Sequence, residues 1–244
     1  MWKILRASVP GSAHVKAKTP CQDAHSAMAT SDGVLVVACA DGAGSAQRSD
    51  EGATAAAAEF VSAACSLVRE KRELGEAAVL ECFRAARRAV EARAVRIEVP
   101  RRELACTLLG AIVGPEQAWF GQIGDGLIVV GENGTGYSPV FWPHAGDYLN
   151  ESDFLTDERY EARLQLAQRK APGELALTTD GLQLLMANLA ARSIHHGFFA
   201  PIFARLREIQ DETALLAPLQ EFLESAAVNA RTDDDKTLLL AVRR

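Results

Sequence analysis

The sequence predicts an α+β fold in which a β-sandwich carries helices on its outer faces. The candidate elements come in the order strands, two helices, strands, helices and a final strand, which suits sheets packed between layers of helices. The candidate strands between residues 104 and 142 follow one another through short turns, which indicates antiparallel pairing in a meander. No repeat, low-complexity linker or change of composition divides the sequence, so residues 1–244 are expected to form a single domain.

The first elements are three strands and two long helices. Residues 2–9 alternate enough for a strand, and residues 24–30 form a weaker one. Residues 34–40 are continuously apolar between two Asp-Gly turns, which is typical of a central strand buried on both faces. Alanine-rich stretches at 49–72 and 75–95 place apolar residues on one face at helical spacing, so both are expected to be helices that pack closely.

The remaining elements return to strands and then alternate. Turn signals containing glycine and proline separate four expected strands, at residues 104–113, 117–123, 127–131 and 137–142. After a polar segment, helices are expected at 158–168, 182–191, 198–209 and 212–229. Two further strands are expected at 174–179 and 236–242.

Composition indicates a soluble globular protein. Its 244 residues are 48% hydrophobic and 24% charged, and the net charge of −6 disfavours nucleic-acid binding. The five cysteines are odd in number and never form C-x-x-C, which indicates a reducing compartment without disulfides or structural zinc. The N-terminus has too short an apolar stretch for a signal peptide, and no segment approaches the roughly 18 apolar residues that span a bilayer. We therefore expect a cytoplasmic protein with no membrane partner.

One region departs from the acidic average. Between Arg69 and Arg102 there are ten Lys or Arg residues against six Glu. The simpler interpretation is a solvated helix face with its exit loop. The alternative is a docking surface for an acidic partner, centred on residues 84–102.

Three aspartates that end apolar stretches and precede glycine carry the strongest functional signal. They are Asp41, Asp125 and Asp180, and a fourth acidic cluster at residues 233–235 stands before the last apolar run. Each has an ordinary explanation by itself: a hairpin turn for Asp125, the start of a helix for Asp41, a solvated loop for the cluster. Together, carboxylates at the ends of several core strands can converge on a hard cation such as Mg²⁺ or Mn²⁺. The pattern therefore suggests a metal-assisted hydrolase.

A series of short motifs covers essentially the whole chain. They are Pro20-Cys-Gln-Asp-Ala24, Asp41-Gly-Ala-Gly-Ser-Ala46, Gly121-Gln-Ile-Gly-Asp-Gly126, Gly146-Asp-Tyr-Leu-Asn150 with Phe154-Leu-Thr156, Thr178-Thr-Asp-Gly-Leu182 and Thr232-Asp-Asp-Asp-Lys-Thr237. In content and order this set resembles the metal-dependent serine/threonine protein phosphatases of type 2C, and within them a bacterial branch. The expected fold is then a four-layer sandwich, with two central antiparallel β-sheets flanked by helices on both outer faces.

The resemblance implies a hydrolase that dephosphorylates phosphoserine and phosphothreonine in proteins. Two divalent cations, Mg²⁺ or Mn²⁺, would bridge a water, lower its pKa and orient the hydroxide for in-line attack on the phosphate ester. No covalent phosphoenzyme is needed. The implied partners are a phosphorylated protein substrate and a cognate kinase, and we expect a monomer.

Carried over by position, the resemblance also implies the metal ligands. Asp41 would bridge both metals and the carbonyl of Gly42 would bind one of them, while Asp180 and Asp234 would complete the other site. Asp234 is preferred to its neighbour in sequence because the family places this ligand three residues before a threonine. Asp23 would lie near the second metal through water, and a third, weaker metal would bind at Asp125.

The chain departs from the family pattern at two positions. Lys18 stands where many members have an arginine that grips the substrate phosphate, and it supplies charge without a bidentate fork. His14 is an alternative phosphate contact or acid; equally, both can be loop residues without a functional contact. Ala43 replaces a histidine that acts as general acid in some relatives, so the proton would come from metal-bound water or another histidine. His25 is one candidate; His144, His195 and His196 are more simply surface or structural residues.

Residues 141–170 occupy the place of the family's flap, a segment that shapes substrate access. Its aromatic residues Tyr148, Phe154 and Tyr160 either line a cleft or pack the segment down, and packing is the preferred interpretation. Two other functions remain open: a catalytically silent module that binds a phosphorylated partner or regulates a kinase, and a phosphatase of small metabolites. Silent relatives usually lose a metal-binding aspartate, whereas Asp41, Asp180 and Asp234 are all present here.

Overall fold

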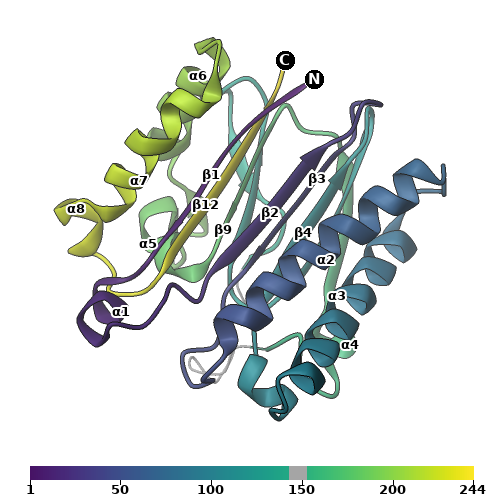
Figure 1. Cartoon of the computed structure of the whole chain (residues 1–244). Coiled ribbons are helices and arrows are strands. Elements are labelled where there is room, and N and C mark those ends of the chain that lie inside the picture. Colours follow the sequence, from purple (N-terminus) through teal and green to yellow (C-terminus); the bar gives the residue numbers. More distant parts are fainter. Residues whose placement is uncertain (143–152) are drawn as a thin grey trace.

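The computed structural model describes residues 1–142 and 153–244 and has the form of a four-layer sandwich (Figure 1). Two five-stranded antiparallel sheets lie in the centre, and helices cover both outer faces. The expected α+β class is confirmed. His144, Tyr148 and the motif at 146–150 lie outside the described residues, as does part of the 141–170 segment.

Each sheet combines strands from distant parts of the sequence. The β1 sheet has the strand order β1 (Trp2–Val9), β12 (Lys236–Arg243), β9 (Glu174–Thr178), β6 (Leu127–Gly131) and β7 (Tyr137–Pro139). The β3 sheet has the order β2 (Ala24–Ala29), β3 (Leu35–Ala40), β4 (Leu108–Val113), β5 (Gln117–Ile123) and β8 (Gln165–Lys170). A small hairpin adds β10 (Ala187–Asn188) and β11 (Ser193–Ile194).

The helices form the two outer layers. The β3 sheet is covered by α2 (Ser49–Arg69) and α3 (Glu76–Arg96), and the β1 sheet by α6 (His196–Glu208) and α7 (Leu216–Glu224). Shorter helices are α1 (Ser12–Ala17), α4 (Tyr160–Arg163), α5 (Gln183–Met186) and α8 (Ala226–Asn229). Single 3₁₀ turns occur at η1 (Arg101–Leu104), η2 (Asp180–Leu182) and η3 (Glu212–Leu215). No helix in the described ranges is long and apolar enough to cross a membrane.

Strand β3 shows why an unbroken apolar run forms the centre of this fold. Val36 and Ala38 pack toward α2 and α3, whereas Leu35, Val37 and Cys39 pack toward the β1 sheet. Successive side chains of a strand point to opposite faces, so a strand between two apolar layers needs apolar residues at every position.

The expected meander over residues 104–142 is wrong as a single sheet, although the antiparallel pairs β4–β5 and β6–β7 are confirmed. Residues 101–104 form a 3₁₀ turn before β4, and β5 and β6 belong to different sheets. The segment containing Asp125 therefore carries the chain from one sheet to the other, and the hairpin explanation for that residue is excluded.

Three expected helices are also revised. The helix at 158–168 ends at Arg163, and the following residues form the edge strand β8, paired to β5. The helix at 182–191 ends at Met186, before β10. The helix at 212–229 divides at Ser225, whose extended backbone and side chain accepting from Val228 N begin a new helix, α8.

Candidate active site

Four aspartates from separate parts of the chain line one small pocket at an end of the sandwich. Asp41 follows β3, Asp125 follows β5, Asp180 follows β9, and Asp234 precedes β12. Antiparallel pairing places these strand ends at the same end of the sandwich, so residues that are far apart in sequence meet there. The pocket has a volume of about 160 Å³ and is lined by Gln22, Asp41, Gly42, Ala43, Gly44, Thr107, Asp125, Phe154, Asp180 and Asp234.

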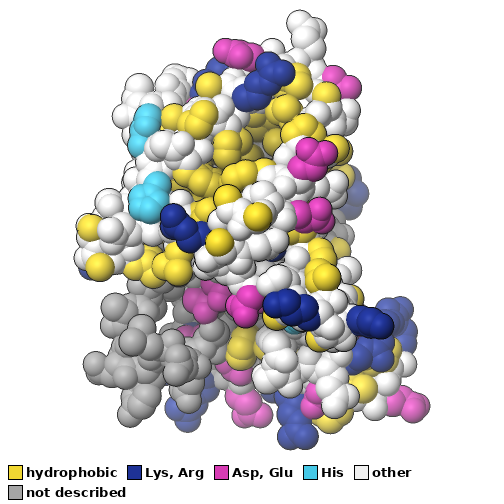
Figure 2. Space-filling model, turned by 90° about the vertical axis from the view of Figure 1, so that its left-hand side faces the viewer, with side chains coloured by type: hydrophobic (Ala, Val, Ile, Leu, Met, Phe, Trp, Pro, Cys, Tyr) yellow, Lys and Arg dark blue, Asp and Glu magenta, His cyan; other side chains and the backbone are white. Residues whose placement is uncertain are grey.

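A larger hollow lies elsewhere and lacks this chemistry. It has a volume of about 410 Å³ between α6 and α7, and Arg205 is its one charged residue among the described lining residues. Figure 2 shows hydrophobic side chains gathered in the upper half of this face, with acidic side chains around their margin and also lower down. Without carboxylates, the hollow does not offer a site for cation-assisted chemistry, so the smaller acidic pocket is the candidate active site.

Glycine is required at two of the Asp-Gly positions because other groups approach closely. A Cβ on Gly42 would lie 2.8 Å from the carbonyl oxygen of Gln22 and 2.8 Å from Ser49 Oγ. A Cβ on Gly181 would lie 2.0 Å from the backbone oxygen of Asp235. These contacts bring the loops that carry the aspartates against one another, which a side chain would prevent.

The backbone of Asp41 is fixed by Thr107, a residue that the sequence analysis missed. Asp41 N donates to Thr107 Oγ1 at 3.0 Å, and Thr107 N donates to Asp41 O at 2.8 Å. Helix α2 begins at Ser49 with no side-chain cap, so Asp41 does not serve the start of that helix. Its carboxylate is therefore left to the pocket.

The carboxylates are buried and crowd one another. The pKa of Asp41 is raised far above its usual range, first by burial and then by the charges of Asp23 and Asp180. Burial, followed by the charge of Asp125, raises the pKa of Asp180 to about 6. The pKa of Asp23 rises to about 8, mainly because of burial. Such a concentration of negative charge in a buried place is typical of a cation site.

The donors fit a divalent cation in type. Asp23 Oδ1 and Asp180 Oδ1 are buried oxygens without a hydrogen-bond partner among the described residues. An unsatisfied buried carboxylate oxygen is costly, and a hard cation satisfies it. In the described ranges no three acidic, histidine or cysteine side chains enclose a metal position as they stand. Holding a cation therefore requires these side chains to turn toward it.

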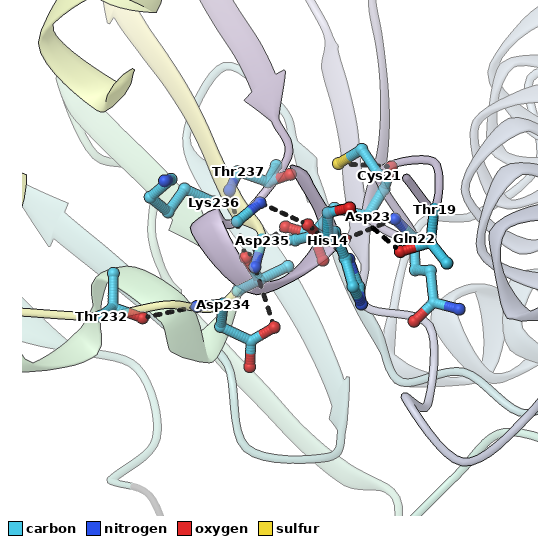
Figure 3. A network of polar contacts seen from close by, with 12 residues as sticks. His14, Thr19, Cys21, Gln22, Asp23, Thr232, Asp234, Asp235, Lys236 and Thr237 are labelled. Atoms are coloured by element: carbon cyan, nitrogen blue, oxygen red, sulfur yellow. Dashed lines mark hydrogen bonds and ion pairs between the residues drawn. The ribbon is translucent and has the colours of Figure 1, made fainter. Parts of the chain in front are cut away.

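The two neighbouring aspartates before β12 have different surroundings (Figure 3). Asp235 is buried and accepts hydrogen bonds from Gly11 N at 2.7 Å, Gln22 N at 2.5 Å and His14 Nδ1 at 2.8 Å. Asp234 faces the pocket, and one of its carboxylate oxygens accepts from Asp235 N at 2.8 Å. Asp235 thus ties α1 and the 20–23 loop together and leaves Asp234 as the available ligand.

The other expected site residues lie around the pocket and do not line it. Asp23 is buried behind it, where its Oδ2 accepts from Thr179 Oγ1 at 2.7 Å. His14 is engaged by Asp235, and Lys18 ends α1 with an exposed side chain and a left-handed backbone (φ 57°). The roles of Lys18 and His14 in phosphate binding stay predictions.

No histidine lines the pocket within the described part of the chain. His25 lies on β2, where burial and then Arg6 lower its pKa to about 4. His195 and His196 hydrogen-bond through ring nitrogens to the carbonyls of Leu185 and Gly134. Ala43 does line the pocket, so the position of the missing family histidine is within the site.

The aromatic residues of the 141–170 segment behave differently from one another. Tyr160 is buried against the helical layer, as expected for packing. Phe154 lines the pocket and also packs against the cluster of Ala43, Ala46 and Ala105, so both interpretations hold for this residue. It is held there because Leu155, next in sequence, donates to Cys106 O at 2.8 Å and is fully buried.

The fold and the acidic pocket suit a hydrolase of the metal-assisted type, and comparisons with known proteins identify the family. The model of the family Protein phosphatase 2C matches residues 10–224. Serine/threonine-protein phosphatase 3 of Escherichia coli (strain K12) is 37% identical over 253 residues, covering 99% of this chain and 98% of that protein. The chain therefore belongs to the protein phosphatase 2C family, and it is an enzyme of the phosphatase class.

Solved structures agree on the fold. The serine/threonine phosphatase Stp1 of Staphylococcus aureus is 15% identical with a TM-score of 0.67, covering 100% of this chain and 96% of that one. The serine/threonine phosphatase PstP/Ppp of Mycobacterium tuberculosis is 16% identical with a TM-score of 0.59, covering 99% of this chain and 98% of that one.

Proposed function

We propose that this phosphatase removes phosphate from phosphoserine and phosphothreonine in proteins, using two divalent cations, Mg²⁺ or Mn²⁺. The observation that carries the proposal is the meeting of Asp41, Asp180 and Asp234 in one pocket of about 160 Å³. The similarity to a relative named serine/threonine-protein phosphatase extends over nearly the whole length of both chains, and it supports the substrate class.

Each residue has a proposed role. Asp41, the Gly42 carbonyl, Asp180 and Asp234 would hold the two cations, and Asp125 would provide a third, weaker site. When bound, such cations lower the pKa of a coordinated water and neutralise charge on the phosphoryl oxygens. Thr107 holds the backbone of Asp41 through two hydrogen bonds, which keeps this residue at the pocket.

A supporting layer orients the ligands. Asp23 is held by Thr179 Oγ1, next to Asp180 in sequence, and is proposed to act through a water. Asp235 gathers three donors from α1 and the 20–23 loop, which places the loop before β12 and hence Asp234. The completeness of this set favours an active enzyme over a silent module.

One set of rate measurements tests the substrate class and the two alternative functions together. Initial rates with Mn²⁺ should be measured on a phosphothreonine peptide, the same peptide bearing phosphotyrosine, and a sugar phosphate. We expect metal-dependent turnover of the phosphothreonine peptide with the highest kcat/KM. Preference for the sugar phosphate would favour a metabolite phosphatase, and phosphopeptide binding without turnover would favour the silent module.

The location and partners follow from the same proposal. All five cysteines are free thiols, which supports a cytoplasmic enzyme. A cognate kinase and a monomeric state are proposed with it, and light scattering of the purified chain checks the latter.

A further inference from the structure

The basic region at 69–102 is largely neutralised by the chain itself. Arg93 pairs with Glu51, Arg101 pairs with Glu91 at 3.1 Å, and Arg84 pairs with Glu161 through two hydrogen bonds of 2.9 and 2.8 Å. A docking surface for an acidic partner needs free positive charge. These contacts instead join α3 to neighbouring parts of the same molecule, including the segment that follows the undescribed residues.

Arg87 makes the most extensive of these contacts. Its Nη1 donates to the backbone oxygens of Leu155, at 2.8 Å, and of Asp157. Its Nε donates to Glu91 Oε1 at 3.0 Å, and its guanidinium carbon lies 4.7 Å from the centre of the Tyr160 ring. The Arg87 side chain is 13% exposed, and its bonds to Leu155 O and Glu91 are partly buried, whereas its bond to Asp157 O is exposed.

The two backbone oxygens that Arg87 holds belong to the turn that carries Phe154. Phe154 N donates to Asp157 Oδ2 at 2.8 Å, and Leu155 N donates to Cys106 O at 2.8 Å. The ring of Phe154 packs with Ala43, which follows Asp41-Gly42. Arg87 therefore fixes a turn whose first residue forms one wall of the acidic pocket.

Phe154 differs chemically from the rest of that wall. It is the only aromatic among the described residues lining the pocket, where carboxylates, glycines and small polar side chains predominate. The phosphate of a substrate would be attracted to the cations that the carboxylates are proposed to hold, so the apolar ring of Phe154 is placed to contact the group to which the phosphate is attached.

We propose that Arg87 is a positioning residue that sets Phe154 as the apolar wall for the leaving group of the substrate. This rests on the proposed phosphatase function of the same pocket. Lysine does not replace it, because a single ammonium cannot hold two backbone oxygens, a carboxylate and a ring face with one planar group.

The test compares Arg87→Met, Phe154→Ala and the double variant on p-nitrophenyl phosphate and a phosphothreonine peptide. Each single variant should raise KM by roughly tenfold with little change in kcat, since the lost apolar contact is made equally in the bound substrate and in the transition state. The double variant should be no worse than the worse single variant, because both changes remove the same contact. Arg87→Lys should not restore KM.

Two controls separate the possible failures. Arg88→Met removes an exposed arginine of the same helix and should leave KM unchanged. Asp157→Ala removes the exposed carboxylate that accepts from Phe154 N and leaves α3 unchanged. It should raise KM in the same way, and it serves as the test if Arg87→Met does not fold.

The outcomes are distinct. Multiplying effects in the double variant, or an unchanged KM in folded Arg87→Met or Asp157→Ala, would overturn the proposal. Turnover by Asp41→Asn at the wild-type level would instead overturn the proposed function. This variant is measured in the same assay.

Discussion

Replacing Asp180 by asparagine should make the metal-free protein more stable while removing its activity. Burial and the charge of Asp125 raise the pKa of Asp180 from 3.8 to about 6. The folded state therefore holds the proton more tightly than the unfolded state, and stability is lost as the pH rises through about 6. At pH 7.5 the Asp180 carboxylate is ionised although burial and the charge of Asp125 disfavour its charged form. Asparagine carries no charge and avoids this cost.

The magnitude follows from the same shift. A rise of about two pKa units corresponds to roughly 3 kcal/mol at pH 7.5, and access of water through the pocket reduces this to about 1–2 kcal/mol. For a chain of this size, that gain raises Tm by about 3–6 °C. At pH 4 the carboxyl is protonated in the folded state and only about half ionised in the unfolded state, so most of the gain should disappear.

The assay is thermal unfolding in chelator at pH 4 and pH 7.5. Asp32→Asn, an exposed turn residue, is the matched control and should change Tm at neither pH. Excess Mn²⁺ should raise the Tm of the wild type and change that of Asp180→Asn much less. A variant less stable than the wild type at pH 7.5 in chelator would refute the reasoning, because it would mean that the carboxylate stabilises the empty pocket.

Two further changes test the frame around the site. Gly181→Ala would place a methyl group against the backbone oxygen of Asp235, and urea unfolding should show a loss of more than about 2 kcal/mol, whereas Gly136→Ala, with open space around it, should cost little; equal stability of the two would contradict the close approach. Arg207→Ala leaves Glu174 fully buried without its cation and should cost about 2–4 kcal/mol in the same measurement. Arg244→Ala, which breaks an exposed pair, should cost less than about 1 kcal/mol, and similar losses for both arginines would contradict that account.

The sequence was sufficient for the parts of the site that depend on local pattern. An apolar strand, an aspartate and a glycine in succession place a carboxylate at a strand end wherever the strand goes, so Asp41 and Asp180 were found from the chain alone. The order of the elements likewise indicated a sandwich covered by helices, which the structure confirms.

The remaining parts depend on which strand ends meet. Thr107 contacts Asp41 because β3 and β4 are neighbours, and residues 104–107 were expected to be a plain strand. Arg87 looked like an exposed charge because its acceptors are backbone oxygens 68 and 70 residues away, which carry no signal in the sequence. The meander failed for a similar reason, since the chain crosses between sheets at Asp125, and the glycines beside it suit a hairpin equally well.

The central claim is that hydrolysis depends on cations held by Asp41 and its neighbours in the pocket. The most direct test is the initial rate on p-nitrophenyl phosphate as Mn²⁺ is added to metal-free protein, for the wild type and Asp41→Asn. The account predicts activity that rises from near zero and saturates for the wild type, is abolished again by chelator, and is lost at every Mn²⁺ concentration in the variant. Turnover by Asp41→Asn similar to that of the wild type, or wild-type turnover that persists in chelator, would contradict it.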